Sequence, residues 1–278
     1  MRVKQQDQNV QITTDTQTLL VTVVQPLIVR VQFGTEPSVR SYAITSLPKQ
    51  TCPFTVTEDN QQVIIRTTRL KVAIDANLHI DVYDQHDQPL VLDYRGERTP
   101  LVRKLNERQA ALSKAEGHAN PDQQTKTRHQ VIKKLHEHDH LYGLGDKTGF
   151  LDKRGYAYDN WNTDNPAPQV ENFTKLYKSV PFILGLTAGR AYGLFFDTTW
   201  PSHFDLGKEN TAYYVYTTEA PCLAYYIFGG TDLAGVLTAY TALTGRTPLP
   251  QKWTLGYHQS RWSYDSEDQD RKSVFGAR

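Results

Sequence analysis

Short runs of β-branched and alternating apolar residues, separated by turn-forming residues, dominate the first third of the chain. These runs lie at residues 19–24, 27–33, 62–67, 70–75 and 78–83. The segments between them are rich in Pro, Gly, Asn and Asp, which are the residues that turns prefer. Regular strand–turn spacing without intervening helices predicts a mainly β fold, an antiparallel β-sandwich.

The second half of the chain continues this pattern. Further runs of the same kind lie at residues 130–135, 192–197, 213–218 and 223–228. The composition agrees, since 16 Tyr, 10 Phe and 4 Trp stand beside a single Met, and aromatic side chains favour pleated, half-buried surfaces. We expect most of these rings in the core or in cross-strand pairs, although aromatic rings also stack on sugars.

Helical patterns interrupt the strands at two places. The segment near residues 100–128 contains helix formers and predicts a helical excursion at the surface. A second helix is expected over residues 231–245, where apolar residues recur at helical spacing and Gly245 follows as a stop. Pro248 and Pro250 then mark a boundary. We therefore assign residues 1–247 to the sandwich domain and residues 248–278 to the opening of a second domain.

The segment after this boundary has the order of an α/β unit. Residues 253–259 are expected to form a strand, and Ser266 to Gln269 has a helix-capping pattern. Only 26 residues follow Lys252. We therefore expect the chain to be truncated one unit into this second domain.

Charge and hydropathy argue against two classes of partner. Lys and Arg number 31 against 30 Asp and Glu, which gives a formal net charge of +1, whereas dedicated nucleic-acid binders carry a basic excess. No apolar run reaches the roughly 18 residues that a membrane helix needs, and the polar N-terminus lacks a signal-peptide core. Two cysteines, Cys52 and Cys222, cannot form a disulfide framework. We expect a cytoplasmic protein with no nucleic-acid and no membrane partner.

Two motifs contain residues that are typical of dinucleotide-binding and metal-binding sites, and we expect neither of them to form such a site. The glycines of residues 142–149 lack the spacing of a dinucleotide fingerprint, and no helical pattern follows them. His136, His138 and His140 would share one face of an extended segment, but three ligands from one flat strand chelate poorly. A solvated strand end is favoured there. We predict no cofactor and no metal.

Residues 158–168 combine Asn, Asp, Trp and Tyr with two prolines. This composition is typical of turns, and equally of loops that bind ligands. Carboxylates and amides can pair with sugar hydroxyls, and an aromatic ring can cover the apolar face of a pyranose. Residues 260–264 have the same chemistry, and they would lie on a catalytic rim if the expected strand before them opened a (β/α)8 barrel.

Several stretches together resemble glycoside hydrolase family 31, the family of α-glucosidases and α-xylosidases, and occur in the family's order. They are residues 142–149, 161–164, 176–182, 192–199, 240–245 and 253–264. The resemblance implies a galactose-mutarotase-like β-sandwich followed by a (β/α)8 catalytic barrel, of which this chain would hold the first strand and the start of a helix.

The resemblance also implies a reaction, the exo-acting cleavage of α-linked sugars with retention of configuration. Two carboxylates perform that chemistry, one as nucleophile and one as acid and base. In the family both are aspartates on later barrel strands, one of them in a Trp-x-Asp-Met-Asn type segment. No such segment occurs here. We therefore expect no catalytic residue in this chain, and no activity from this chain alone.

Four substrate-binding residues follow from the resemblance. Thr163 and Asp164 match the family's N-terminal loop, which reaches over the barrel mouth, while Trp262 and Tyr264 match the lining of the pocket. We expect Asp164 to accept hydrogen bonds from sugar hydroxyls and Trp262 to shape the pocket for the non-reducing sugar.

The expected partner is an oligosaccharide substrate containing α-linked glucose. An α-xylosidase of the same family and a stand-alone carbohydrate-binding β-sandwich stay open as alternatives. Apolar surface around Trp253, at the start of the second domain, predicts self-association into a homo-oligomer.

Overall fold

The computed structural model describes residues 1–34, 41–44, 51–59, 61–99, 129–165, 169–171, 173–258 and 265–275. The chain divides into two units, residues 1–245 and residues 246–278, which are described separately. The helical excursion expected near residues 100–128 lies outside the described residues. None of the described helices combines the length and the hydropathy that a membrane crossing requires.

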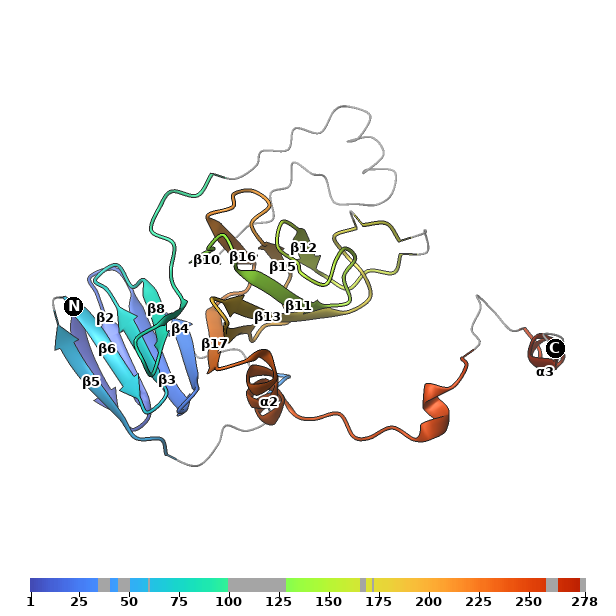
Figure 1. Ribbon diagram of the computed structural model, residues 1–278, viewed down its shortest axis with the longest axis horizontal. Coiled ribbons are helices and arrows are strands. Elements are labelled where there is room, and N and C mark those ends of the chain that lie inside the picture. Colours follow the sequence, from blue (N-terminus) through green and yellow to red (C-terminus); the bar gives the residue numbers. More distant parts are fainter. Residues whose placement is uncertain are drawn as a thin grey trace. The chain divides into compact units, whose positions relative to one another are not determined.

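The described residues of the first unit form three antiparallel sheets (Figure 1). The large sheet has eight strands, in the spatial order β1 (Arg2–Gln6), β2 (Asn9–Thr13), β3 (Thr18–Gln25), β4 (Ile28–Phe33), β17 (Leu223–Gly230), β14 (Arg190–Phe196), β13 (Ser179–Thr187) and β11 (His140–Gly145). The five-stranded sheet runs β5 (Phe54–Asp59), β6 (Gln62–Thr67), β7 (Leu70–Ile74), β8 (Ile80–Asp84) and β9 (Pro89–Val91). The four-stranded sheet runs β10 (His129–Lys134), β16 (Tyr213–Thr218), β15 (Ser202–Asp205) and β12 (Ala157–Asn160).

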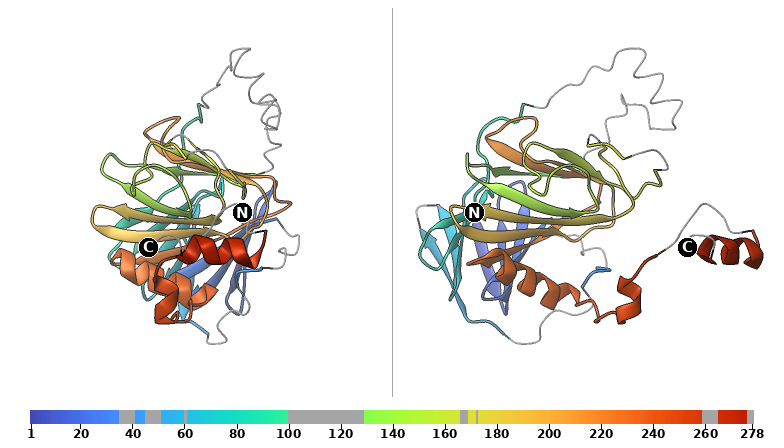
Figure 2. Two further views of the ribbon diagram at one scale, coloured as in Figure 1. Left: turned by 90° about the vertical axis from the view of Figure 1, so that its right-hand side faces the viewer. Right: turned by 45° about the vertical axis from the view of Figure 1, so that its right-hand side comes forward.

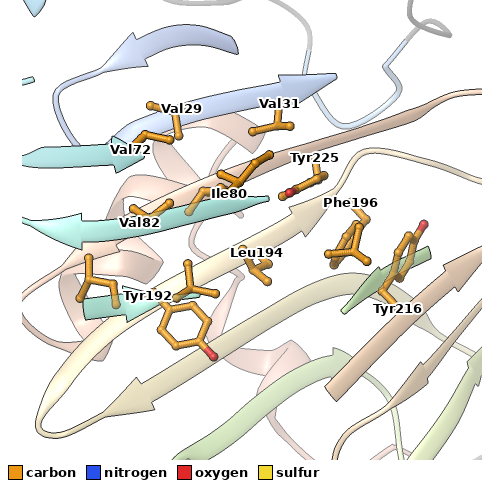
Figure 3. Packing of buried hydrophobic residues seen from close by; sticks show 14 of the residues in the cluster. Val29, Val31, Val72, Ile80, Val82, Tyr192, Leu194, Phe196, Tyr216 and Tyr225 are labelled. Carbon is orange, nitrogen blue, oxygen red and sulfur yellow. The ribbon is translucent and has the colours of Figure 1, made fainter. Parts of the chain in front are cut away.

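One apolar core connects the large sheet with the two smaller sheets (Figure 3). It contains Val29 of β4, Val72 of β7, Leu194 of β14, Tyr216 of β16 and Tyr225 of β17. Successive residues of a strand point to opposite faces, so the alternating pattern of each strand brings one apolar set into this layer. The antiparallel, sandwich-like β fold predicted from the strand spacing is confirmed, and β6 and β16 have the predicted bounds.

Helix α2 (Leu233–Thr244) packs against β13, β14 and β17 of the large sheet, as Figure 2 shows from two sides. Asp232 begins the helix, because its Oδ1 accepts a hydrogen bond from the Gly235 N–H at 2.7 Å. Val236 is fully buried, and Tyr240 stacks on Phe182 with the ring centroids 4.0 Å apart. The helix predicted over residues 231–245 is therefore confirmed.

A buried ion pair links the three sheets at one point. Lys133 of β10 is fully buried, and its Nζ lies 2.6 Å from Asp93 Oδ1 and 3.5 Å from the Tyr225 hydroxyl. The second carboxylate oxygen of Asp93 accepts a hydrogen bond from the Ile80 N–H at 2.6 Å. Burial disfavours the charged form of Lys133, but the Asp93 carboxylate outweighs it and raises the pKa of the lysine. The pair therefore joins the four-stranded sheet to the other two.

The second unit contains a 3-10 helix, η1 (Lys252–Leu255), and the helix α3 (Glu267–Phe275). The strand expected at residues 253–259 is wrong over its described part, residues 253–258. A strand needs a neighbour for its backbone groups. Here these groups bond locally instead, with Thr254 N donating to Gln251 O at 3.0 Å and Gly256 N donating to Trp253 O at 3.1 Å. The expected first barrel strand is therefore not formed over residues 253–258, the part of it that the structure describes.

The capping pattern predicted before α3 is present. The Ser266 hydroxyl oxygen accepts a hydrogen bond from the Gln269 N–H at 3.3 Å, and the helix begins at Glu267. This contact satisfies one of the N–H groups that the first helical turn leaves without an intrahelical partner.

Candidate functional site

The predicted sugar-binding loop leaves the end of β12, an outer strand of the four-stranded sheet. Residues 158–160, predicted from the sequence to belong to this loop, lie in the strand instead. Tyr158 and Asn160 belong to β12 and pair with Phe204 and Ser202 of β15. Asn and Asp favour turns locally, but the burial of Tyr158 and the hydrogen-bonded ladder with β15 outweigh that preference. The loop itself comprises residues 161–165 among the described residues.

Asp159 fixes the strand end from which the loop departs. Its Oδ1 lies 2.8 Å from His203 Nδ1, its Oδ2 accepts a hydrogen bond from the Thr174 hydroxyl at 2.9 Å, and its N–H donates to Thr174 O at 3.0 Å. Burial opposes ionisation of Asp159, but the hydrogen bond and the charge of His203 outweigh it and lower the pKa of the carboxyl. The carboxylate thus ties β12 to β15 and to the segment after the loop.

Lys147 approaches the same strand end from the glycine-rich segment 142–149. Its Nζ donates a hydrogen bond to the Asp159 carbonyl oxygen at 2.9 Å. Burial lowers the pKa of Lys147 to about 8, and the nearby Asp159 and Asp146 carboxylates only partly offset this. The segment therefore contacts the base of the loop through Lys147. Its glycine spacing does not fit a nucleotide-binding motif.

Asp164 is exposed and is held by a tyrosine from the returning segment. The Tyr177 hydroxyl lies 2.9 Å from Asp164 Oδ1 and 3.0 Å from Asn165 O, so its single O–H proton is shared between these two acceptors. The hydrogen bond to Asp164 raises the pKa of Tyr177. Because an ionised carboxylate offers about four acceptor sites, Asp164 keeps capacity for ligand hydroxyls while it is held in place.

Thr163 has backbone and side-chain contacts within the loop. Its N–H donates to Leu176 O at 3.0 Å, and its hydroxyl donates to the Trp161 carbonyl at 3.0 Å. The structure thus places Thr163 and Asp164 on one loop that is tied twice to residues 176–177. Trp262 and Tyr264 lie outside the described residues, so their predicted pocket positions stay predictions.

Sequence reasoning missed Tyr177 and His203 as parts of this site. Tyr177 falls within the stretch 176–182 that carried the resemblance, but no local pattern pairs it with the loop. His203 lies 44 residues from Asp159 along the chain. Only the antiparallel pairing of β12 with β15 brings these two side chains together.

The histidines of residues 136–140 do not share one strand face. Residues 136–139 form a turn, in which the His136 N–H donates to Asp139 Oδ2 at 2.8 Å. The expected solvated strand end is therefore a turn. The His136 N–H donates to the Asp139 carboxylate and not to a neighbouring strand. His140 instead lies beside Asp152, with 2.7 Å between Nδ1 and Oδ2. Among the described residues, no group of three or more His, Cys, Asp or Glu is arranged to hold a metal ion.

A family model matches residues 18–205, and its description is the glycosyl hydrolase 31 N-terminal galactose mutarotase-like domain. The chain is 47% identical over 141 residues to alpha-glucosidase 2 of Bacillus thermoamyloliquefaciens, a match that covers 51% of this chain and 18% of the relative. It is 34% identical over 138 residues to an alpha-glucosidase of Saccharolobus solfataricus, covering 50% of this chain and 20% of the relative. The matched part is therefore about a fifth of the length of these relatives.

Two further comparisons bear on substrate class and fold. The chain is 34% identical over 116 residues to the alpha-xylosidase XylQ of Lactiplantibacillus pentosus, covering 42% of this chain and 14% of the relative. A GH31 dextranase of Flavobacterium johnsoniae, solved in complex with isomaltotriose, aligns with a TM-score of 0.78 at 26% identity. That alignment covers 99% of this chain and 31% of the dextranase chain.

Proposed function

The chain belongs to glycosyl hydrolase family 31, because the model of that family's N-terminal galactose mutarotase-like domain matches residues 18–205. We propose that it is the N-terminal part of a retaining, exo-acting α-glucosidase. In this proposal the chain supplies a substrate-binding loop, residues 161–165, and the catalytic carboxylates lie in another part of the enzyme. Family members that cleave α-glucosides with retention need two carboxylates about 5 Å apart. The loop offers one exposed carboxylate, at Asp164.

The observation that carries the proposal is the Asp164–Tyr177 contact. A flexible aspartate would lose side-chain entropy on binding a sugar, whereas the 2.9 Å hydrogen bond from Tyr177 restricts Asp164 beforehand. The loop base is held by Asp159 and Lys147, so the carboxylate stands on an anchored segment. Charged hydrogen bonds from Asp164 to sugar hydroxyls would then orient the substrate without taking part in bond cleavage.

An α-glucoside is the favoured substrate, since the relative with 47% identity is an alpha-glucosidase and the dextranase was solved with a glucose trisaccharide. The second candidate is an α-xyloside, which the 34% identity to an alpha-xylosidase supports. Pocket residues decide between the two sugars, because a xyloside lacks the hydroxymethyl group. Trp262 is our candidate for that decision.

Cytoplasmic localisation belongs to the same proposal. Cys52 and Cys222 are both free thiols, the state that reducing compartments maintain.

Self-association stays a prediction, based on the exposure of Trp253 (73%) and Leu255 (75%) in the second unit.

The test is an Asp164→Ala substitution in the whole enzyme that carries this domain. Loss of a hydrogen bond to a charged group should reduce transition-state stabilisation by about 1.5–3 kcal/mol. This corresponds to a drop of about 10- to 150-fold in kcat/KM for p-nitrophenyl α-glucoside. Asp15→Ala, another exposed aspartate, is the matched control and should leave kcat/KM unchanged. Equal values for the two variants would contradict the proposed role of the loop.

A further inference from the structure

A pocket of about 560 Å³ opens beside the base of the loop, and Trp161 of the loop lines it whereas Asp164 does not. It lies where the end of β12 meets the ends of β13, β14 and β15. Its lining includes Asn160, Trp161, Ser179, Asp197 and Trp200. Its volume falls within the roughly 300–1,000 Å³ of small-ligand sites.

Asn160 is the unusual member of this lining. The residue is only 6% exposed, and neither its Oδ1 nor its Nδ2 has a hydrogen-bond partner among the described residues. The buried hydroxyl of Ser179, which lines the same pocket, also has none there. Buried polar groups are nearly always paired, so two residues with orphaned polar atoms in the lining of one pocket point to a polar ligand.

Aromatic rings and a carboxylate complete the chemistry of the pocket. Trp161 is 53% exposed and Trp200 is 43% exposed, although both are large apolar side chains. Asp197 lies in the same lining, and its Oδ1 accepts a hydrogen bond from the Ser41 hydroxyl at 2.8 Å. A planar ring presents a surface for an apolar face, while an amide and a carboxylate present acceptors for hydroxyl groups.

We propose that this pocket is a second saccharide-binding site, in which the Asn160 carboxamide pairs with the hydroxyls of a pyranose and a tryptophan ring covers its apolar face. A carboxamide supplies two donors and an acceptor, so it can both donate to and accept from neighbouring sugar hydroxyls. A purely apolar occupant would leave Asn160 and Ser179 unpaired, and an anion would meet the Asp197 carboxylate. The pocket residues exclude Asp164, so the proposal does not depend on the role of that residue.

The experiment titrates the 278-residue chain with methyl α-D-glucopyranoside and with isomaltose, and follows the indole N–H signals of its tryptophans by NMR. We expect shifts of the Trp161 and Trp200 signals that saturate in the millimolar range. Asn160→Leu, which keeps the shape and removes the amide, should weaken binding about tenfold or more, because it removes two or more hydrogen bonds. Its thermal midpoint should stay equal or rise, because the unpaired amide is gone.

Asn9→Leu is the matched control. Asn9 lies on β2 and its Oδ1 accepts a hydrogen bond from the Thr22 hydroxyl at 2.7 Å. This variant should lose thermal stability and keep the affinity for the sugar, the reverse of Asn160→Leu. Should Asn160→Leu fail to fold, Trp200→Ala alters an exposed side chain. In this variant the sugar should no longer shift the Trp161 signal.

Three results would overturn the proposal. One is the absence of any saturable shift of Trp161 or Trp200 with either sugar. Another is an Asn160→Leu variant that folds and binds with wild-type affinity. The third is a drop in thermal midpoint for Asn160→Leu as large as that for Asn9→Leu, which would assign the carboxamide a structural partner.

Discussion

Replacing Lys133 with methionine should destabilise the first unit by about 3–5 kcal/mol, because the substitution leaves the Asp93 carboxylate buried without its partner. Lys133 is fully buried and the Asp93 side chain is 14% exposed, with 2.6 Å between Nζ and Oδ1. At this separation the Coulomb attraction is about 6 kcal/mol at an effective dielectric constant of about 20. Desolvation costs several kcal/mol for each of the two ions, so the pair contributes little net stability. Removing either partner is nevertheless strongly destabilising, because the charge of the other partner is then left uncompensated.

Single and double substitutions of this ion pair should therefore differ. Lys133→Met and Asp93→Asn should each be strongly destabilising, whereas Lys133→Met combined with Asp93→Asn should recover most of the loss, since no charge stays buried. Urea unfolding of the 278-residue chain, followed by circular dichroism, gives the free energies by linear extrapolation. Single variants that lose less than about 1 kcal/mol, or a double variant whose loss equals the sum of the single losses, would refute the argument.

Three further changes test the site and the fold. Tyr177→Phe in the whole enzyme should raise KM more than it lowers kcat, because it releases Asp164 without removing the carboxylate; unchanged kinetics would count against the holding contact. Burial lowers the pKa of Lys147 to about 8 in the folded chain. Between about pH 8 and 10.4 the lysine is therefore more protonated in the unfolded chain than in the folded chain. The free energy of unfolding consequently rises with pH in that window. Relative to Lys147→Met, urea unfolding should therefore show wild type gaining about 1–2 kcal/mol from pH 7.5 to 10, a figure reduced for the partial exposure of the side chain. Gly143→Ala should lower the free energy of unfolding by more than about 2 kcal/mol. Gly143 has φ +111°, and an added Cβ would lie 2.3 Å from the Phe182 carbonyl oxygen. A thermal midpoint equal to that of the wild type would contradict this expectation.

Strand spacing alone was enough to predict much of the sandwich. The runs at residues 62–67 and 213–218 became β6 and β16, and the apolar spacing after Thr231 became α2. These predictions succeeded because local periodicity and burial agree in those segments. Strand β13 was missed because Pro181 and Gly185 weaken its local pattern. Gly185 is nevertheless required there, because an added Cβ would lie 2.2 Å from the Tyr192 ring on the neighbouring strand.

The candidate site could be predicted only in part. Composition and resemblance pointed to Thr163 and Asp164, since the loop itself carries their chemistry, and their contact with a sugar stays a prediction. The anchors Tyr177 and His203, in contrast, reach the loop through pairings that join distant segments, and the orphaned amide of Asn160 is a property of packing. The strand expected near Trp253 failed for a related reason, because a strand forms only beside a partner strand.

In the function proposed above, this chain provides substrate contacts to a glycoside hydrolase whose catalytic carboxylates lie in another part of the enzyme. The most direct measurement compares hydrolysis of p-nitrophenyl α-glucoside and p-nitrophenyl α-xyloside by the 278-residue chain and by the protein encoded when its gene is extended downstream. We predict activity only in the extended protein, with the glucoside as the better substrate. Hydrolysis by the 278-residue chain itself would contradict the account, since the catalytic carboxylates would then lie within it.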